Sequence, residues 1–462
     1  MTKRRYAALS KRSCNCQNRN VSTWGGRPGA VRLRGPRIAH WKRLINSYPN
    51  PVIASRESWL LGREALMRLF DFLVPLWLLG IVFPPTLESD FADVLHFGSL
   101  VWLPCVALLM GRDQFLIGPV LRKRMSMLFW TAATLVTITG SALVSADPLR
   151  SLGYVAASGV GLICCAGLWQ IVKTHVFDWL STYAMLGSAL VVYLYFTGPR
   201  IQGRLSMSAT SHANYLGLVA FGFLMCALVV RSRFLAALLI VTNFVVIIAA
   251  QSRGPLIAAV LGLLVYGTLK LTCVTKGNTA FAAVSACLVC VVVLLIYQDA
   301  VENWVSSLLF LHDKYRGIGT GFTRRLDAWQ EALDLFKANP MFGVGFRMHE
   351  QYMTTLSSAH NGYLSLLADV GLVGAISPFV LTALSAWRLL RLSLDGNEIA
   401  ILGFSFVVGY LFLATFERFL LGMGNPTSIV AWLFLFMPDG SRTVTSPGIR
   451  SCIHWKTMDV PV

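Results

Sequence analysis

Long apolar runs alternate with short polar loops along most of the chain, from about residue 65 to residue 438. A helix needs roughly 17–25 residues to cross a bilayer, and lipid offers an unpaired backbone no hydrogen-bond partner, so each run predicts a membrane-spanning helix. The last run is short and is expected to tilt or to be partly re-entrant. The twelve runs lie near residues 65–83, 94–110, 127–145, 151–172, 177–197, 212–230, 234–250, 255–272, 279–297, 362–387, 398–416 and 426–437.

One long polar stretch, residues 298–361, interrupts this pattern between the ninth and tenth runs. Within it, apolar residues recur at helical spacing and predict an amphipathic helix that ends at Asn339-Pro340. Such a helix can lie in the membrane interface. Its predicted apolar face consists of Phe322, Leu326, Trp329, Leu333 and Phe336.

Composition supports the membrane assignment. Hydrophobic residues make up 55% of the 462 residues and charged residues only 13%, whereas soluble proteins carry about a quarter charged residues. The predicted fold is therefore an all-α polytopic membrane protein: helices one to nine over 65–297, a larger loop over 298–361, and helices ten to twelve over 362–438. Most of the ten cysteines lie in apolar runs, where a thiol behaves as a small hydrophobe rather than as part of a disulfide scaffold.

The net charge of +18 suits anionic lipids or a phosphate-bearing substrate. Much of it comes from residues 1–64, which we interpret as a basic, disordered cytoplasmic tail lying near anionic lipid. Nucleic-acid binding is the weaker alternative for this tail. Residues 439–462 form a second predicted cytoplasmic tail.

The Lys and Arg residues orient the predicted helices. With the N-terminus inside, short inside loops carry eleven of them and short outside loops carry five, as the positive-inside rule requires. Both termini are then cytoplasmic and the long loop is extracytoplasmic. This topology places Arg204, Arg253, Arg324, Arg325 and His360 on one side, from three separate loops.

Two short loops on that side carry candidate anion ligands. Arg253 lies in a Q-S-R-G turn close to the hydrocarbon edge, where an arginine is costly unless it is paired or functional; its alternative is snorkelling to lipid phosphate. Arg204 precedes His212 and Asn214, at the start of a predicted helix. A helix N-terminus beside an arginine suits an anion, and an ordinary capped loop is the alternative.

The long loop carries the remaining candidates. Arg325 flanks the apolar face of the amphipathic helix whereas Arg324 points away, so Arg325 is the better ligand for a lipid phosphate; a lid with solvated arginines is the alternative. His360 and Asn361 stand where a helix begins. The helix dipole there disfavours imidazolium, and a neutral histidine is a suitable general base, although a lone histidine is often structural.

Arginines and a neutral base at a membrane–water boundary indicate group transfer from a lipid pyrophosphate. Guanidinium groups would bind the pyrophosphate and stabilise the charge that develops as it leaves. The loops show no D-x-D motif or carboxylate cluster, so the sequence requires neither a metal nor a cofactor.

Three motifs resemble the bacterial O-antigen ligase/polymerase family, over roughly residues 200–420. The first runs RLDAW, NPMFGVGF and AHNGYLSLLADVGLVG within residues 325–374, and the second is the S-R-G turn at Arg253. The third is RLSMSATSHANYLG, in which His212-Ala213 replaces the usual Asn-Pro and weakens the parallel for Arg204.

The resemblance implies a GT-C-like fold in the inner membrane of a Gram-negative bacterium, with its active face in the periplasm. It implies metal-independent, inverting transfer of a glycan from undecaprenyl pyrophosphate to a saccharide hydroxyl. Arg253 and Arg325 would bind the pyrophosphate, Arg204 would assist and His360 would be the base. The predicted substrate-binding set is completed by Arg324, Asn361, Trp329, His212 and Asn214.

The acceptor stays open between the lipid A core, which would make a ligase, and a growing polysaccharide, which would make a polymerase. The alternative from another class is a transporter or flippase of lipid-linked glycans. A transporter would place ionisable groups along a path at mid-membrane, often with internal repeats, whereas here the polar residues gather at one face.

Overall fold

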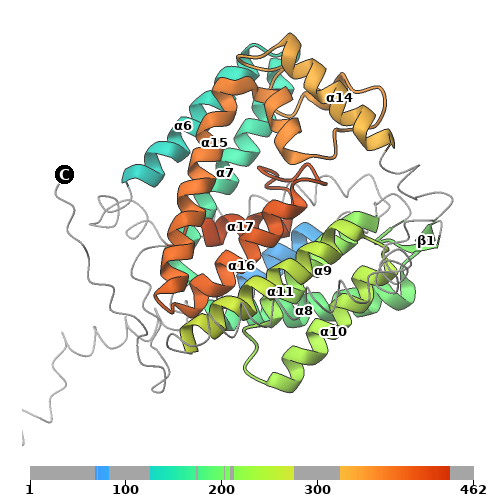
Figure 1. The fold of residues 1–462 in the computed structure, drawn as a ribbon, viewed down its shortest axis with the longest axis vertical. Coiled ribbons are helices and arrows are strands. Elements are labelled where there is room, and N and C mark those ends of the chain that lie inside the picture. Colours follow the sequence, from blue (N-terminus) through green and yellow to red (C-terminus); the bar gives the residue numbers. More distant parts are fainter. Residues whose placement is uncertain are drawn as a thin grey trace, which may run out of the picture. The chain divides into compact units, whose positions relative to one another are not determined.

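The computed structural model describes residues 68–69, 71–82, 125–172, 175–201, 203–208, 213–274 and 323–437. All of them belong to one compact unit, Arg63–Val462, and this unit is mostly helical (Figure 1). An all-α membrane fold is thereby confirmed in outline. The predicted spans near 94–110 and 279–297, both predicted tails, residues 298–322 of the long loop and His212 lie outside the described residues.

Where the predicted apolar runs are described, they are helices, and most begin and end within about three residues of the prediction. An unlabelled apolar helix, Asp71–Val82, precedes the labelled ones. The labelled helices are α6 (Met125–Leu143), α7 (Pro148–Val172), α8 (Val176–Thr197), α9 (Ala213–Ala227), α10 (Arg233–Ala249), α11 (Arg253–Val274), α14 (Thr323–Ala338), α15 (Gly362–Leu394), α16 (Glu398–Leu413) and α17 (Pro426–Leu435), with a 3-10 turn η3 (His349–Gln351).

Five of the described helices, α6, α7, α8, α11 and α15, are long and apolar enough to cross a membrane, and five apolar helices are shorter. The shortest is α17, whose 10 residues are all buried. A helix of that length extends about 15 Å, half of a hydrocarbon core of about 30 Å. This agrees with the expectation that the last run does not cross the membrane as a simple span.

The helices pack as two groups joined by α16 and α17. In one group α6 packs against α7 and α15, and in the other α9 packs against α8, α10 and α11 (Figure 1). Helix α16 contacts both α15 and α11, while α17 contacts α7 and α9. A helix that is apolar all round is suited to such a central position.

Helix α15 contains a kink that the sequence did not predict. Gly371 has φ 63° and ψ −169° and divides the helix into a short first part and a long second part. The run from residue 362 was predicted as one continuous span, and this is corrected. The first part belongs structurally to the loop before it, as described below.

The polar segment before α9 is also more ordered than predicted. Two-residue strands β1 (Arg200–Ile201) and β2 (Arg204–Leu205) pair antiparallel, and Gly203 turns the chain between them with φ 77°. The hairpin fixes the direction from which Arg204 leaves the backbone.

Candidate functional site

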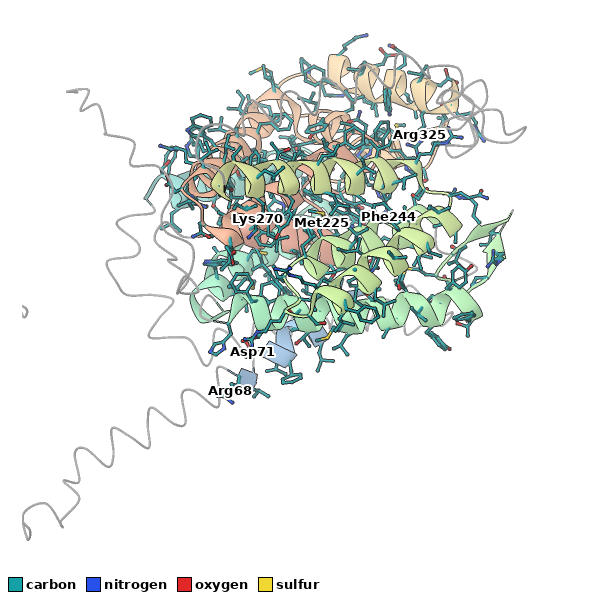
Figure 2. All side chains as sticks on the ribbon, turned by 60° about the horizontal axis from the view of Figure 1, so that its bottom comes forward. Arg68, Asp71, Met225, Phe244, Lys270 and Arg325 are labelled. Carbon is teal, nitrogen blue, oxygen red and sulfur yellow. The ribbon has the colours of Figure 1, made fainter. Side chains whose placement is uncertain are left out.

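The candidate residues gather where α9, α11 and α15 begin and where α16 ends. The backbone N–H of Gly362, the first residue of α15, donates to the Ala414 carbonyl just beyond α16 at 2.7 Å. Figure 2 shows Arg325 well apart from Asp71 and Lys270. Lys270 belongs to the other end of α11, where its Nζ lies 2.7 Å from Glu398 Oε1 at the start of α16.

Asn214, in the first turn of α9, connects most of these elements. Its Oδ1 accepts from the Arg204 guanidinium and, at 3.3 Å, from the Ser252 hydroxyl, and its Nδ2 donates to Glu417 Oε1 at 2.9 Å. Gly217 permits this approach, because a Cβ there would lie 2.7 Å from Ser252 Cβ. One amide thus links the hairpin, the S-R-G turn and the segment after α16.

The guanidinium group of Arg204 donates hydrogen bonds to other groups of the protein. Its Nε donates to the Ala250 carbonyl at 3.0 Å, and an Nη donates to the Gln251 carbonyl at 3.4 Å as well as to Asn214. The carbonyls at the end of α10 lack helical partners, and Arg204 satisfies two of them. Its geometry is that of a residue that positions the S-R-G turn.

The turn presents Arg253 as the first residue of α11, half-buried. Ser252 beside it is buried. An added Cβ at Gly254 would meet nothing nearer than Leu413 Cδ2 at 3.6 Å, followed by Phe416 Cβ at 3.7 Å. Packing within the protein therefore does not require glycine at this position.

His360 lies beside a carboxylate that the sequence did not single out. Its Nδ1 is 3.8 Å from Glu417 Oε2, and the side chains are 23% and 9% exposed. The Nδ1 atom is buried without a hydrogen-bond partner, so the solvent-exposed part of the imidazole ring does not include Nδ1. Asn361 follows as the N-cap of α15 and accepts from the backbone N–H groups of Tyr363 and Leu364.

Helix α14 brings Arg325 to the same end. Arg325 is half-buried and its Nη1 lies 3.4 Å from the Phe416 carbonyl, next to Glu417 in the chain. Arg324 is exposed and turns instead to the Thr355 carbonyl at 3.3 Å. The two arginines point in different directions, as the helical periodicity predicted.

The buried side of α14 is not the large apolar face read from the sequence. Ala332 packs in a small cluster with Ala359 and Ala368, while Leu326 is 51% exposed and Trp329 is half-buried. Small residues let α14 lie close to the start of α15 (Figure 1). The larger apolar side chains are consequently more exposed than the alanines.

A backbone clasp explains the P-x-x-G-x-G motif. The N–H groups of Val344 and Gly345 donate to the carbonyls of Ala368 and Asp369, and the N–H groups of Leu372 and Val373 donate to those of Pro340 and Met341. A Cβ at Gly343 would lie 2.3 Å from the Asp369 backbone, and one at Gly371 would lie 2.4 Å from the Met341 backbone. Both glycines are needed for this close approach.

A second polar cluster lies behind the clasp and was missed in the sequence. Arg347 Nη2 is 3.5 Å from Glu350 Oε1, which also pairs with Arg418. Burial, and then the charge of Arg418, lower the pKa of Arg347 against the opposing effects of Glu350, Asp369 and Tyr154. Arg347 lies two residues after the last glycine of the motif, and only that position hinted at a role.

Backbone strain is concentrated around the same site. Among the described residues, three non-glycine residues have positive φ: Gln251 at 48°, Arg347 at 62° and His360 at 46°. Such conformations are costly and cluster at functional sites. Gln251 provides a carbonyl that Arg204 contacts, Arg347 belongs to the second polar cluster, and His360 is itself a candidate residue.

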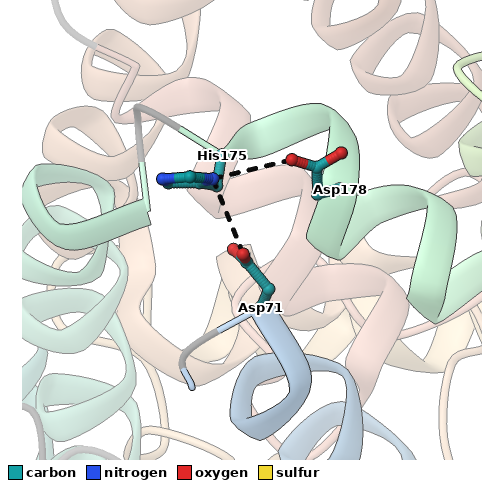
Figure 3. A group of neighbouring side chains, drawn as sticks. All are labelled: Asp71, His175 and Asp178. Carbon is teal, nitrogen blue, oxygen red and sulfur yellow. Dashed lines mark ion pairs between the residues drawn. The ribbon is translucent and has the colours of Figure 1, made fainter. Parts of the chain in front are cut away.

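A possible metal-ligand group lies elsewhere in the described chain. His175 Nδ1 is 3.6 Å from Asp71 Oδ2 and 3.5 Å from Asp178 Oδ2 (Figure 3). Asp178 Oδ1 also pairs with Arg231 at 3.3 Å. These ion pairs hold the start of α8, although the buried Oδ1 of Asp71 has no hydrogen-bond partner among the described residues. Figure 2 shows Asp71 remote from Arg325.

Comparison with known families adds an independent observation. Residues 235–379 match the sequence model of the O-antigen ligase family. This region is similar to an O-antigen ligase domain. No curated protein matches the chain.

The O-antigen ligase match supports the predicted ligase/polymerase family, the glycosyltransferase-like class of enzyme and a membrane-embedded protein. It covers Arg253, Arg325 and His360. Arg204, Asn214 and Glu417 lie outside the matched residues. Arg204 and Asn214 reach the O-antigen ligase region through hydrogen bonds with the Ala250 carbonyl and the Ser252 hydroxyl. Glu417 reaches it through its 3.8 Å contact with His360.

Proposed function

We propose that this protein transfers a glycan from undecaprenyl pyrophosphate to a saccharide hydroxyl. The observation that carries the proposal is that three features lie together at one end of the described unit. They are the His360–Glu417 pair, the contact of Arg325 with the Phe416 carbonyl, and the start of α11 with Arg253, where Gly254 neighbours Phe416. Guanidinium groups suit a pyrophosphate, and a histidine beside a carboxylate suits proton removal from a hydroxyl.

In this mechanism the acceptor oxygen attacks the anomeric carbon while the bond from that carbon to the pyrophosphate breaks. His360 accepts the hydroxyl proton, and Glu417 stabilises the imidazolium that forms. Arg253 and Arg325 bind the leaving pyrophosphate and neutralise its charge. Attack opposite the leaving group inverts the anomeric centre and needs no metal.

The remaining predicted residues position these groups. Arg204 and Asn214 hold the S-R-G turn against Glu417, and Asn361 caps the helix that follows His360. Arg324 and Trp329 belong to the part of α14 next to Arg325 and are proposed to meet the substrate. We place this face in the periplasm, with the protein in the inner membrane and both termini in the cytoplasm.

The acceptor is proposed to be either the lipid A core or a growing polysaccharide. The test is reconstitution of the purified protein with undecaprenyl-pyrophosphate glycan, with and without lipid A core, in the presence of EDTA. Product on the core would identify a ligase, and longer lipid-linked chains would identify a polymerase.

Variants assign the roles in the same assay. His360→Gln and Arg253→Gln are expected to lose about a hundredfold or more in transfer. The control His175→Gln removes a histidine from the remote cluster and should retain activity. Full activity in His360→Gln would remove the general-base role, and glycan movement across vesicles without transfer would indicate a transporter.

A further inference from the structure

A cavity with charged and apolar residues in its lining adjoins the proposed reaction site and has no role in the mechanism above. It lies between the first turns of α15, the turn at residues 346–350 and the segment at residues 418–422. Gly362 lines it, two residues after His360. Glu417 lies beside His360 and Arg418 lines the cavity, so two adjacent residues belong to the reaction site and to the cavity respectively.

The closed end of the cavity has unused hydrogen-bonding groups. His349 is 1% exposed, and its Nδ1 lies 2.8 Å from Asp369 Oδ1, which also accepts from the backbone N–H of His349. Since a carboxylate accepts, Nδ1 carries the proton. The other ring nitrogen, Nε2, and the hydroxyl of Ser365 are buried without a partner, although buried polar atoms are normally hydrogen-bonded.

The open end carries two arginines that share one carboxylate oxygen. Arg347, Glu350 and Arg418 are 24%, 28% and 32% exposed, so they can be reached from solvent. Glu350 Oε1 pairs with both guanidinium groups, while Nε of Arg347 is buried without a hydrogen-bond partner. Glu350 thus stands where an external oxyanion could bind.

We propose that this cavity binds the acidic group of a sugar, with its oxyanion on Arg347 and Arg418. Once Glu350 is displaced, the adjoining hydroxyl groups of the sugar reach His349 Nε2 and Ser365. The incoming oxyanion displaces Glu350 from the arginines. Guanidinium groups bind carboxylates and phosphates through the same paired geometry. The assignment of this sugar to the saccharide substrate rests on the proposed function. The inference that the cavity binds an acidic sugar does not depend on it.

The test measures sugar binding to the purified full chain in detergent by ligand-observed NMR titration. Glucuronate and glucose 6-phosphate present a carboxylate and a phosphate, and glucose is the neutral comparison. An acidic sugar is expected to bind about tenfold or more tightly than glucose, and Arg418→Gln should remove about that factor. The control Arg200→Gln changes an arginine of the hairpin and should leave binding unchanged.

Glu350→Gln provides a test that misfolding cannot imitate, because it should strengthen binding of the acidic sugar. Equal binding of glucose and the acidic sugars, or no gain in Glu350→Gln, would overturn the proposal. Loss of binding in Arg253→Gln with none in Arg418→Gln would assign the sugar to the reaction site instead. Intact binding without any glycan transfer would refute the proposed function and leave this site standing.

Discussion

Replacing Gly371 by alanine should break the clasp that places the site. Gly371 lies at the kink of α15 with φ 63° and ψ −169°, a combination that is nearly restricted to glycine. An added Cβ would lie 2.4 Å from the Met341 carbonyl carbon and 2.5 Å from its oxygen. Backbone atoms cannot rotate away as a side chain can, so the two segments must separate.

The size of the destabilisation follows from the contacts that are lost when the two segments separate. The backbone conformation costs alanine about 1–3 kcal/mol. Opening the clasp removes the hydrogen bonds of Leu372 N–H to the Pro340 carbonyl at 2.8 Å and of Val373 N–H to the Met341 carbonyl at 3.2 Å, each worth about 1 kcal/mol. We expect a total destabilisation of about 4 kcal/mol.

Gly396 is the matched control. Its φ is 81°, yet an added Cβ would meet nothing within 4 Å, so Gly396→Ala should cost only about 1–2 kcal/mol. The assay is thermal unfolding of both variants in the same detergent, followed by glycan transfer at a temperature where both are folded. Equal melting temperatures in the two variants would refute the role assigned to the clasp.

Three further predictions concern single contacts. The added methyl group of Gly254→Ala fits at ordinary contact distance, so the melting temperature should be unchanged. A loss of glycan transfer would mean that the substrate approaches the backbone at Gly254. Unchanged transfer would mean that the substrate does not approach it. Asn214→Ala removes the hydrogen bond to Glu417 and should reduce glycan transfer about tenfold. Asn243→Ala, which removes a buried amide of α10, is the control for folding. Equal losses of transfer in the two variants would contradict a special role for Asn214. Burial tends to raise the pKa of Glu331, but hydrogen bonds from Thr354 and Thr355 outweigh it and lower this pKa below its usual 4.5. The contact is therefore complete above that value and is lost as pH falls through the lower folded pKa. Protection of the Thr354 amide, measured relative to its intrinsic exchange rate at each pH, should fall in acid in the wild type but not in Glu331→Gln.

Local patterns predicted the helices well because apolar length and periodicity are local properties. The starts of α9 and α11 follow this rule, as does the end of α14 at Ala338, directly before Asn339. Asn361 was placed correctly at the start of α15, where its side chain caps the helix. The kink at Gly371 could not be predicted in this way, because its cause is a segment some thirty residues earlier in the chain.

Part of the candidate site could be predicted because some of its residues are visible as local exceptions in the sequence. Arg253, Arg325 and His360 are conspicuous because polar residues are costly at a membrane boundary. Glu417 is an isolated acidic residue between apolar runs, and the same rule could have indicated it. Arg347 and His349 gave no comparable signal, since their importance depends on contacts with Glu350, Arg418 and Asp369 that no local pattern encodes.

The segment between α16 and α17 determines how the two polar clusters relate. Its backbone carbonyls at Phe419 and Leu420 accept from the Tyr410 hydroxyl, and Leu420 also accepts from Trp432 Nε1 at 3.0 Å. Both donors are fully buried aromatic side chains, so they fix the segment against the core. Glu417 and Arg418 consequently keep their places beside His360 and the cavity without help from substrate. Rigid support of this kind is what precise placement of a charge requires, and it means that a substrate spanning both clusters would meet them already aligned.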